Sequence, residues 1–164
     1  MQHEIERKFL VANDAWRAGA DAGHRLRQAY LAETGQVAIR ERVVDGSSAV
    51  LTIKSAAPGV SREEYEYPIP PSDADALIEL GGGSVLDKTR FRVPHGGRTW
   101  EVDVYSGENE SLVVAEVEIE DAAARVEPPP WVGREVTDDP RYYAASLAKR
   151  PYRLWSDPDV RRGA

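Results

Sequence analysis

The chain has 164 residues, enough for one domain with a sizeable core. Its net charge of −7 argues against a general nucleic-acid binder, because such proteins are usually basic. Without cysteine it can form neither a disulfide nor a thiolate metal site. No apolar run approaches the roughly 20 residues of a membrane helix, and the polar start is unlike a signal peptide. We therefore expect a cytoplasmic protein with no nucleic-acid or membrane partner.

Alternation of apolar and polar residues predicts a mainly β chain with a few helices. Strands are expected at residues 4–9, 25–31, 36–44, 49–55, 62–69, 86–93, 98–105 and 112–120. Capping residues and prolines predict short helices at 13–20, 73–80 and 138–149. We expect a single domain over residues 1–150, followed by a C-terminal tail over 151–164.

The first strand carries an unusual set of charges. Glu4, Glu6 and Lys8 share one face, because side chains alternate along a strand. Carboxylates two residues apart lie roughly 7 Å from each other and repel by roughly 2 kcal/mol at an effective dielectric near 20. A divalent cation such as Mg²⁺ or Mn²⁺, which prefers hard oxygen ligands, would relieve this repulsion. The alternative is an edge strand whose charged face lies in water.

The other strands sort their charges by sign. Residues 36–44 and 86–93 carry cations on the polar face, whereas residues 98–105 and 112–120 carry mainly carboxylates. A solvated face normally mixes the two signs. If the sheet closes as a barrel, these faces line a lumen with a cationic wall and an anionic wall. Such a lumen suits phosphoryl transfer, because Arg and Lys bind phosphate and a metal screens it from the carboxylates. A plain wet sheet is the alternative.

Glu4-Ile5-Glu6-Arg7-Lys8 resembles the ExExK signature of the triphosphate tunnel metalloenzymes, the CYTH superfamily. The resemblance continues in order through Arg40-Glu41-Arg42, Leu51-Thr52-Ile53-Lys54, Arg62-Glu63-Glu64-Tyr65-Glu66, Lys88-Thr89-Arg90, Glu101-Val102-Asp103, Glu116-Val117-Glu118, Glu135-Val136-Thr137 and Arg141-Tyr142. It implies an α+β, mainly β fold: an eight-stranded antiparallel barrel, with a few flanking helices, as in the short bacterial members. One departure is Ala144, where members often have Asn.

The resemblance also implies a role for each matching residue. The metal ligands, for Mg²⁺ or Mn²⁺, would be Glu4, Glu6, Glu116 and Glu118, with Asp103 beside them. The phosphates would be held by Lys8, Arg40, Arg42, Lys54, Lys88 and Arg90. Lys8, Glu64 and Glu66 would be catalytic, and the two glutamates would place a second metal or the attacking water. In the alternative interpretation, Glu64 and Glu66 only form ion pairs with arginines of the tunnel. The strand at 25–31 lies near this site in the pattern, which leaves open which of its side chains face inward.

These expectations converge on metal-dependent hydrolysis of a linear triphosphate. Inorganic tripolyphosphate is the preferred small-molecule substrate, yielding pyrophosphate and phosphate, because the polar strand faces carry few groups that could read a base. An adenylyl cyclase, a thiamine triphosphatase and a non-catalytic polyphosphate or nucleotide sensor are the alternatives. A sensor would not need the complete set of carboxylates, which favours the enzyme. The pattern is compatible with a homodimer but does not predict one.

Overall fold

The computed structural model describes residues 2–55, 61–82, 84–121 and 123–155, apart from the side chains of residues 2–4 and 61–62. Its strands are β1 (Gln2–Val11), β2 (His24–Glu33), β3 (Val37–Val44), β4 (Ser48–Ser55), β5 (Ser61–Ile69), β6 (Leu86–His95), β7 (Arg98–Tyr105), β8 (Val113–Glu118) and β9 (Val132–Glu135). Its helices are α1 (Pro71–Gly81) and α2 (Ala144–Lys149), with short 3₁₀ turns η1 (Asp14–Gly19), η2 (Gly107–Asn109), η3 (Pro140–Tyr142) and η4 (Tyr152–Leu154).

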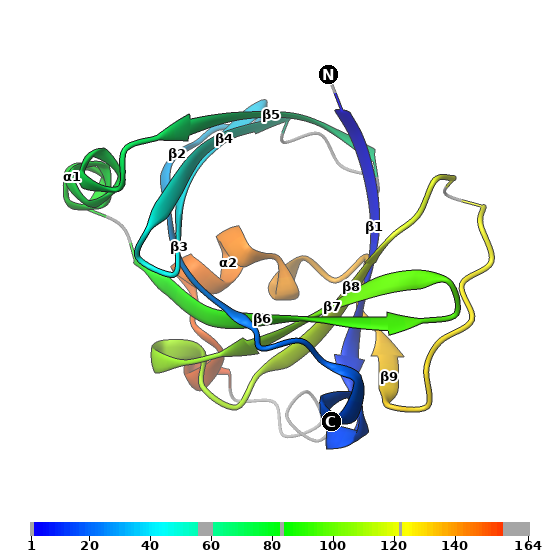
Figure 1. Cartoon of the computed structure of the whole chain (residues 1–164). Helices are drawn as coiled ribbons and strands as arrows, with labels where there is room; N and C mark the ends of the chain where they lie inside the picture. Colours follow the sequence, from blue (N-terminus) through cyan, green and yellow to red (C-terminus); the bar gives the residue numbers. More distant parts are fainter. Residues whose placement is uncertain (1, 56–60, 83, 122, 156–164) are drawn as a thin grey trace.

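The strands form an antiparallel barrel. They follow the order β5-β4-β3-β2-β6-β7-β8-β1-β9, and β5 also pairs with β1. The pairing of β5 with β1 closes the strands β1 through β8 into a ring of eight, which is visible end-on in Figure 1. The predicted eight-stranded barrel is therefore confirmed. The short ninth strand, β9, pairs with the second half of β1 and was not predicted, because Val132-Gly-Arg-Glu lacks a clear alternation.

Two tight hairpins fix the register of neighbouring strands. At the β3–β4 turn, Asp45 and Gly46 have φ of 51° and 68°. At the β6–β7 turn, Gly96 and Gly97 have φ of 59° and 74°. Two consecutive positive φ values characterise the type I′ turn, whose twist matches that of antiparallel strands. The register then sets which charges meet inside the barrel, such as Arg90 opposite Asp103.

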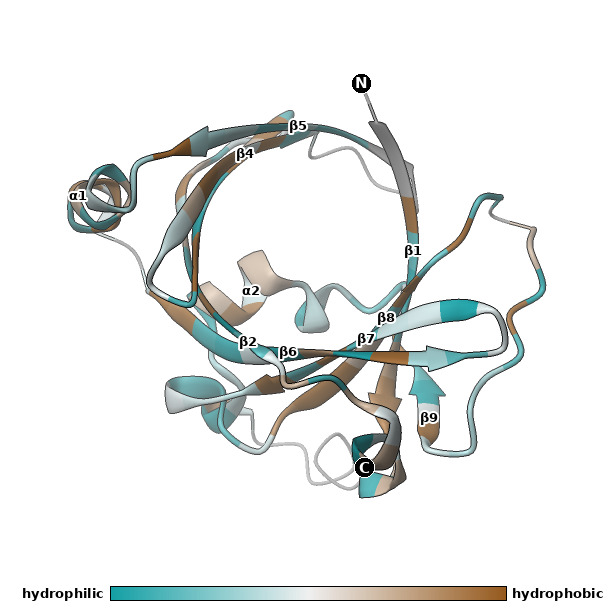
Figure 2. Ribbon diagram, viewed as in Figure 1, coloured by the Kyte–Doolittle hydropathy of each residue, from teal (hydrophilic) through white to brown (hydrophobic). Residues whose placement is uncertain are grey.

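An apolar layer covers the outside of the barrel on the side of β1, β6, β7 and β8. Trp16 from η1 and Trp131, just before β9, pack on this layer around Trp100. On another side, α1 covers β2 to β4, with Ala74 packed against Val43 and Ala49. Figure 2 colours the ribbon by hydropathy, including α1 and the barrel strands. The residues that face away from the lumen are thus mainly apolar, as the alternation predicts.

The C-terminal segment fills one end of the lumen. Leu10 and Leu86 lie on the same strand faces as Lys8 and Lys88, and they pack against Tyr142 and Leu147. Figure 1 shows α2 inside the outline of the ring. The cluster also includes Tyr152 and Trp155, which are buried although they lie beyond the domain boundary expected after residue 150.

The helices differ from prediction in detail. Residues 14–19 form a 3₁₀ turn, and the stretch predicted as one helix over 138–149 is a 3₁₀ turn followed by α2. In the described part of the chain, we find no helix that is both long and apolar enough to cross a membrane.

Candidate active site in the barrel lumen

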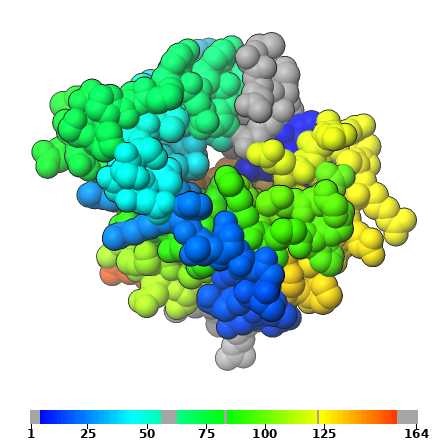
Figure 3. Space-filling model, in the orientation of Figure 1, coloured from blue at the N-terminus to red at the C-terminus, as the bar shows by residue number. Residues whose placement is uncertain are grey.

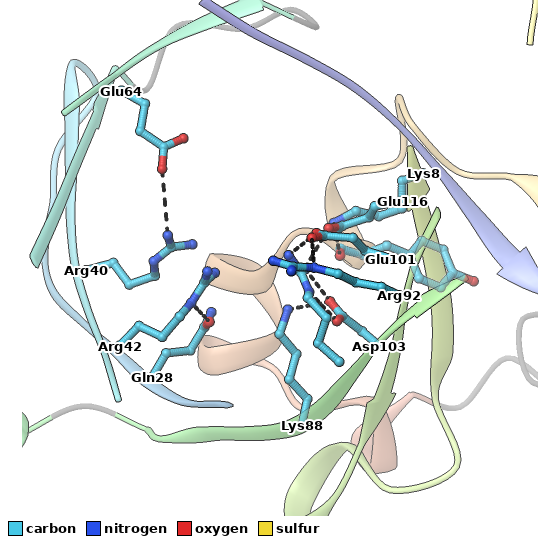
Figure 4. A network of polar contacts seen from close by, with 12 residues as sticks. Lys8, Gln28, Arg40, Arg42, Glu64, Lys88, Arg92, Glu101, Asp103 and Glu116 are labelled. Atoms are coloured by element: carbon cyan, nitrogen blue, oxygen red, sulfur yellow. Dashed lines mark hydrogen bonds and ion pairs between the residues drawn. The ribbon is translucent and has the colours of Figure 1, made fainter. Parts of the chain in front are cut away.

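The candidate site is the polar part of the lumen. Charged side chains reach it from β1 and from β3 to β8. The remaining barrel strand, β2, adds Gln28, which Figure 4 shows beside Arg42. In space-filling view, the corresponding face of the molecule is hollowed at its centre (Figure 3). The site lies between this open face and the apolar cluster formed by the C-terminal segment.

Arg90 is the centre of the larger charged network. Its Nε and Nη2 atoms donate to the two oxygens of Asp103, each over 2.7 Å. Nη2 also donates to Glu116 over 2.8 Å, and Nη1 donates to Glu101. Three carboxylates from β7 and β8 therefore surround a single guanidinium from β6. The bidentate contact with Asp103 is the geometry in which Arg–carboxylate pairs are strongest.

Two buried lysines complete this network. Lys88 donates to Asp103, whose side chain is fully buried. Lys8 lies 2.9 Å from Glu116 and also donates to the backbone carbonyl of Tyr142, over 3.3 Å. The first strand is thereby tied to the C-terminal segment at the inner end of the lumen.

The network shifts the protonation of its members. Burial alone would raise the pKa of Asp103, but Arg90 and Lys88 outweigh it and hold the pKa below its usual value. Glu116 behaves in the same way beside Lys8 and Arg90, and its pKa lies well below the usual range. Burial and the adjacent Arg90 lower the pKa of Lys88 to about 8. Asp103 and Glu116 are therefore charged at neutral pH, and Lys88 remains mainly protonated there although its pKa is lowered.

A second group of charges lies on β4 and β5. Glu64 lies 2.6 Å from Lys54 and 3.9 Å from Arg40. Arg40 also donates to the Thr52 hydroxyl, which donates in turn to Glu66; both distances are 3.2 Å. Glu64 thus pairs with two basic residues of the lumen, as in the alternative role that the sequence analysis left open, whereas the exposed Glu66 is linked to Arg40 only through Thr52.

The third group is one pair, Arg42 and Gln28. The Nε atom of Arg42 donates to the Gln28 side-chain oxygen over 3.1 Å. Burial and the nearby Arg40 lower the pKa of Arg42 to about 10. Arg42 therefore remains charged at neutral pH, in contact with a neutral partner.

The expected metal ligands are only partly gathered. Register places Glu6 directly opposite Glu118, and Lys8 directly opposite Glu116, on β1 and β8. Glu6 is partly buried and Glu118 is exposed, while the side chain of Glu4 lies outside the described residues. Within the described part of the chain, no three acidic or histidine side chains are arranged as a ready metal site.

The donor chemistry nevertheless suits a hard divalent cation. Glu6, Glu116 and Glu118 offer carboxylate oxygens on two adjacent strands, and the pKa of Glu116 is far too low for protonation to compete with a metal. Both oxygens of Glu116 are engaged by Lys8 and Arg90, so a metal there would have to displace one of these cations. Asp103 fits less well still, because it is fully buried and accepts three hydrogen bonds from Arg90 and Lys88. Its contacts indicate that it positions these two cations.

Sequence reasoning assigned no role to two members of the site. Glu101 binds Arg90, and its signal was its place two residues before Asp103, on the same face of β7. Gln28 contacts Arg42, but the strand pattern alone did not show that its side chain faces inward. The expectation that the lumen has one cationic wall and one separate anionic wall is also wrong around β6. Its cations lie directly beside the carboxylates of β7 and β8, because β6 and β7 form one hairpin.

Comparison with known proteins identifies the family. A model of the CYTH domain matches residues 2–152. An inorganic triphosphatase from Acetivibrio thermocellus is 44% identical over 158 residues, covering 96% of this chain and 100% of that protein. An inorganic triphosphatase from Nitrosomonas europaea is 41% identical over 150 residues, covering 88% and 96%. The crystal structure of an inorganic triphosphatase superposes with a TM-score of 0.65 at 37% identity, covering 90% of this chain and 95% of that one. Family model, relatives and barrel agree, and the chain belongs to the CYTH domain family.

Proposed function

We propose that this protein is a divalent-metal-dependent triphosphatase that hydrolyses inorganic tripolyphosphate to pyrophosphate and phosphate. The observation that carries the proposal is a lumen to which four strands bring basic side chains beside the carboxylates of β7 and β8. These basic side chains include Lys8, Arg40, Arg42, Lys54, Lys88 and Arg90. The two inorganic triphosphatases that resemble this chain along most of its length support the same activity.

The basic side chains would hold the phosphates through charge-assisted hydrogen bonds. Arg40 and Arg42 point into the lumen from β3, opposite Glu101, Asp103 and Glu116 (Figure 4). A phosphate chain that spans this distance would contact both sides at once. Such positioning by several fixed cations is the main contribution that a protein makes to phosphoryl transfer.

Glu4, Glu6, Glu116 and Glu118 would hold the metal, with Asp103 orienting Arg90 and Lys88 beside them. When bound, Mg²⁺ or Mn²⁺ would neutralise charge on the transferring phosphoryl group. Lys8, Glu64 and Glu66 would act at the reacting atoms, with Lys8 holding a phosphate oxygen and the glutamates placing the attacking water. Glu64 and Glu66 lie on β5, which pairs with the other side of β1 from β8, so only β1 separates them from Glu116 and Glu118 in the ring.

The shape of the lumen favours a substrate without a nucleoside. Its polar part is lined by charged groups, and its inner end is filled by the cluster around Tyr142 and Leu147. A base and ribose would therefore gain little binding energy inside. A cyclase has the opposite requirement, since it must position the ribose hydroxyl for attack on the α-phosphate.

A substrate panel tests the proposal. Tripolyphosphate, ATP and thiamine triphosphate would each be assayed with Mg²⁺, with Mn²⁺ and in excess EDTA, measuring phosphate, pyrophosphate and cyclic AMP. We expect phosphate release, loss of turnover in EDTA, and a kcat/KM for tripolyphosphate at least about tenfold above that for ATP. Glu6→Gln should abolish turnover, whereas Glu79→Gln, the same change on the exposed face of α1, should not.

Each alternative has its own signature in this panel. Cyclic AMP with stoichiometric pyrophosphate would identify a cyclase, and preferred cleavage of thiamine triphosphate would identify that substrate. Tight binding without turnover would identify a sensor. Full activity in excess EDTA would refute the metal assignment.

A further inference from the structure

Arg42 differs from the other basic residues of the lumen in its partner. Lys8, Arg40, Lys54, Lys88 and Arg90 each lie within 4.0 Å of a carboxylate oxygen. Among the described residues, Arg42 has no such contact, and its side chain bonds instead to the amide oxygen of Gln28. Its positive charge is therefore held in place without being paired.

Gln28 is itself held firmly. It is fully buried on β2, between its register partners Arg42 on β3 and Leu86 on β6. Its side-chain nitrogen has no hydrogen-bond partner among the described residues. A buried amide that leaves a donor unsatisfied is unfavourable for stability, so packing alone does not explain a glutamine here. Among the described residues, its side-chain hydrogen bond is the one to Arg42.

Neutrality is the property that separates this pair from the rest of the network. Glutamate has the same length and would accept the same hydrogen bond, but it would pair with Arg42 as Asp103 pairs with Arg90. Glutamine accepts through Oε1 and leaves the guanidinium charge for another anion. With Nε engaged, the two terminal nitrogens of Arg42 point toward the lumen (Figure 4).

We propose that Gln28 is a positioning residue whose neutral amide fixes Arg42 for a substrate phosphate while leaving its charge unpaired. This inference rests on the proposed triphosphatase function and adds a determinant of substrate affinity to it. The phosphate would approach the two terminal nitrogens of Arg42, which, among the described residues, are bonded to no carboxylate.

Gln28→Glu is the decisive variant, because it changes charge and almost nothing else. We expect kcat/KM for tripolyphosphate with Mg²⁺ to fall at least about tenfold, mainly through KM, corresponding to about 1.4 kcal/mol of lost binding. Its Tm should equal or exceed that of the wild type, because a buried ion pair replaces a neutral contact. Gln28→Leu, which removes the acceptor but adds no charge, should lose less. Gln36→Glu adds the same charge at an exposed loop position and is the matched control.

The Arg42→Gln background tests the cause. There, Gln28→Glu should have little further effect, because its partner is already absent. Wild-type KM in Gln28→Glu, or an undiminished effect of that change without Arg42, would overturn the proposal. If Gln28→Glu does not fold, Gln28→Leu decides: raised KM at unchanged Tm supports the proposal, and wild-type KM overturns it. Wild-type protein that does not hydrolyse tripolyphosphate would refute the proposed function and this inference with it; a normal wild type with a normal Gln28→Glu would refute only the inference.

Discussion

Replacing Asp103 by asparagine should destabilise the protein strongly. The Asp103 side chain is fully buried and accepts hydrogen bonds from Lys88 and from two nitrogens of Arg90. Asparagine keeps the shape but removes the charge that compensates these cations. Breaking a buried ion pair by removing one partner typically costs about 3–5 kcal/mol, because the remaining charge stays buried. Arg90 retains Glu101 and Glu116, so we expect a value near the lower end, about 3 kcal/mol.

The pH dependence of this cost provides an independent check. Lys88 has a pKa of about 8 in the folded wild type, below its usual 10.5, and loss of Asp103 would lower it further. The variant can therefore release the Lys88 proton at a lower pH than the wild type. The cost should accordingly decrease as the pH rises from about 6 to 9, since each pKa unit of difference corresponds to about 1.4 kcal/mol.

Urea unfolding of wild type and variant at pH 6, 7 and 9 measures both quantities. Glu101→Gln is the matched control: it also removes a carboxylate from Arg90, but its side chain is 28% exposed, so we expect less than about 1 kcal/mol. If Asp103→Asn costs no more than this control, or if its cost does not change with pH, the described network does not hold its charges in a buried environment.

Two further predictions concern stability away from the network. Glu41 on β3 is fully buried, and burial raises its pKa to about 7. Its contribution to stability should therefore be complete below about pH 4.5 and be lost as the pH rises through about 7. Glu41→Gln should remove up to about 3 kcal/mol of this pH dependence, and an equal change in unfolding free energy between pH 5 and pH 8 for both proteins in urea would contradict the prediction. Leu147 is fully buried in the cluster formed by the C-terminal segment, so Leu147→Ala should lower the free energy of unfolding by about 2–5 kcal/mol, measured by the same urea unfolding. A loss typical of a surface site would show that this segment does not close the lumen.

Much of the barrel follows from local sequence. Side chains alternate along a strand, so the faces of Glu6 and Lys8, of Lys88 and Arg90, and of Asp103 could be assigned before any strand was placed. The turn residues at 45–46 and 96–97 marked where strands reverse. These properties depend on neighbours a few residues apart, and the order of the charged motifs then indicated the family.

Which charges meet was decided by the tertiary structure. Alternation places Asp103 and Arg90 on the inner face, but only the pairing of β6 with β7 puts them in contact and leaves Asp103 poorly suited to bind a metal directly. Gln28 is an ordinary strand residue until β2 lies beside β3 and brings it to Arg42.

The sequence by itself determined the faces of the strands, the inventory of lumen charges and the family. The fold was needed to show how one end of the lumen is filled, which charges are partners, and that Arg42 is bonded to a neutral amide and, among the described residues, to no carboxylate. Tyr142 and Trp155 pack at the inner end more than 120 positions after β1 in the chain, beside Leu10. Local periodicity carries no information about contacts over such separations, because they are set by barrel closure and by the packing of the C-terminal segment inside it.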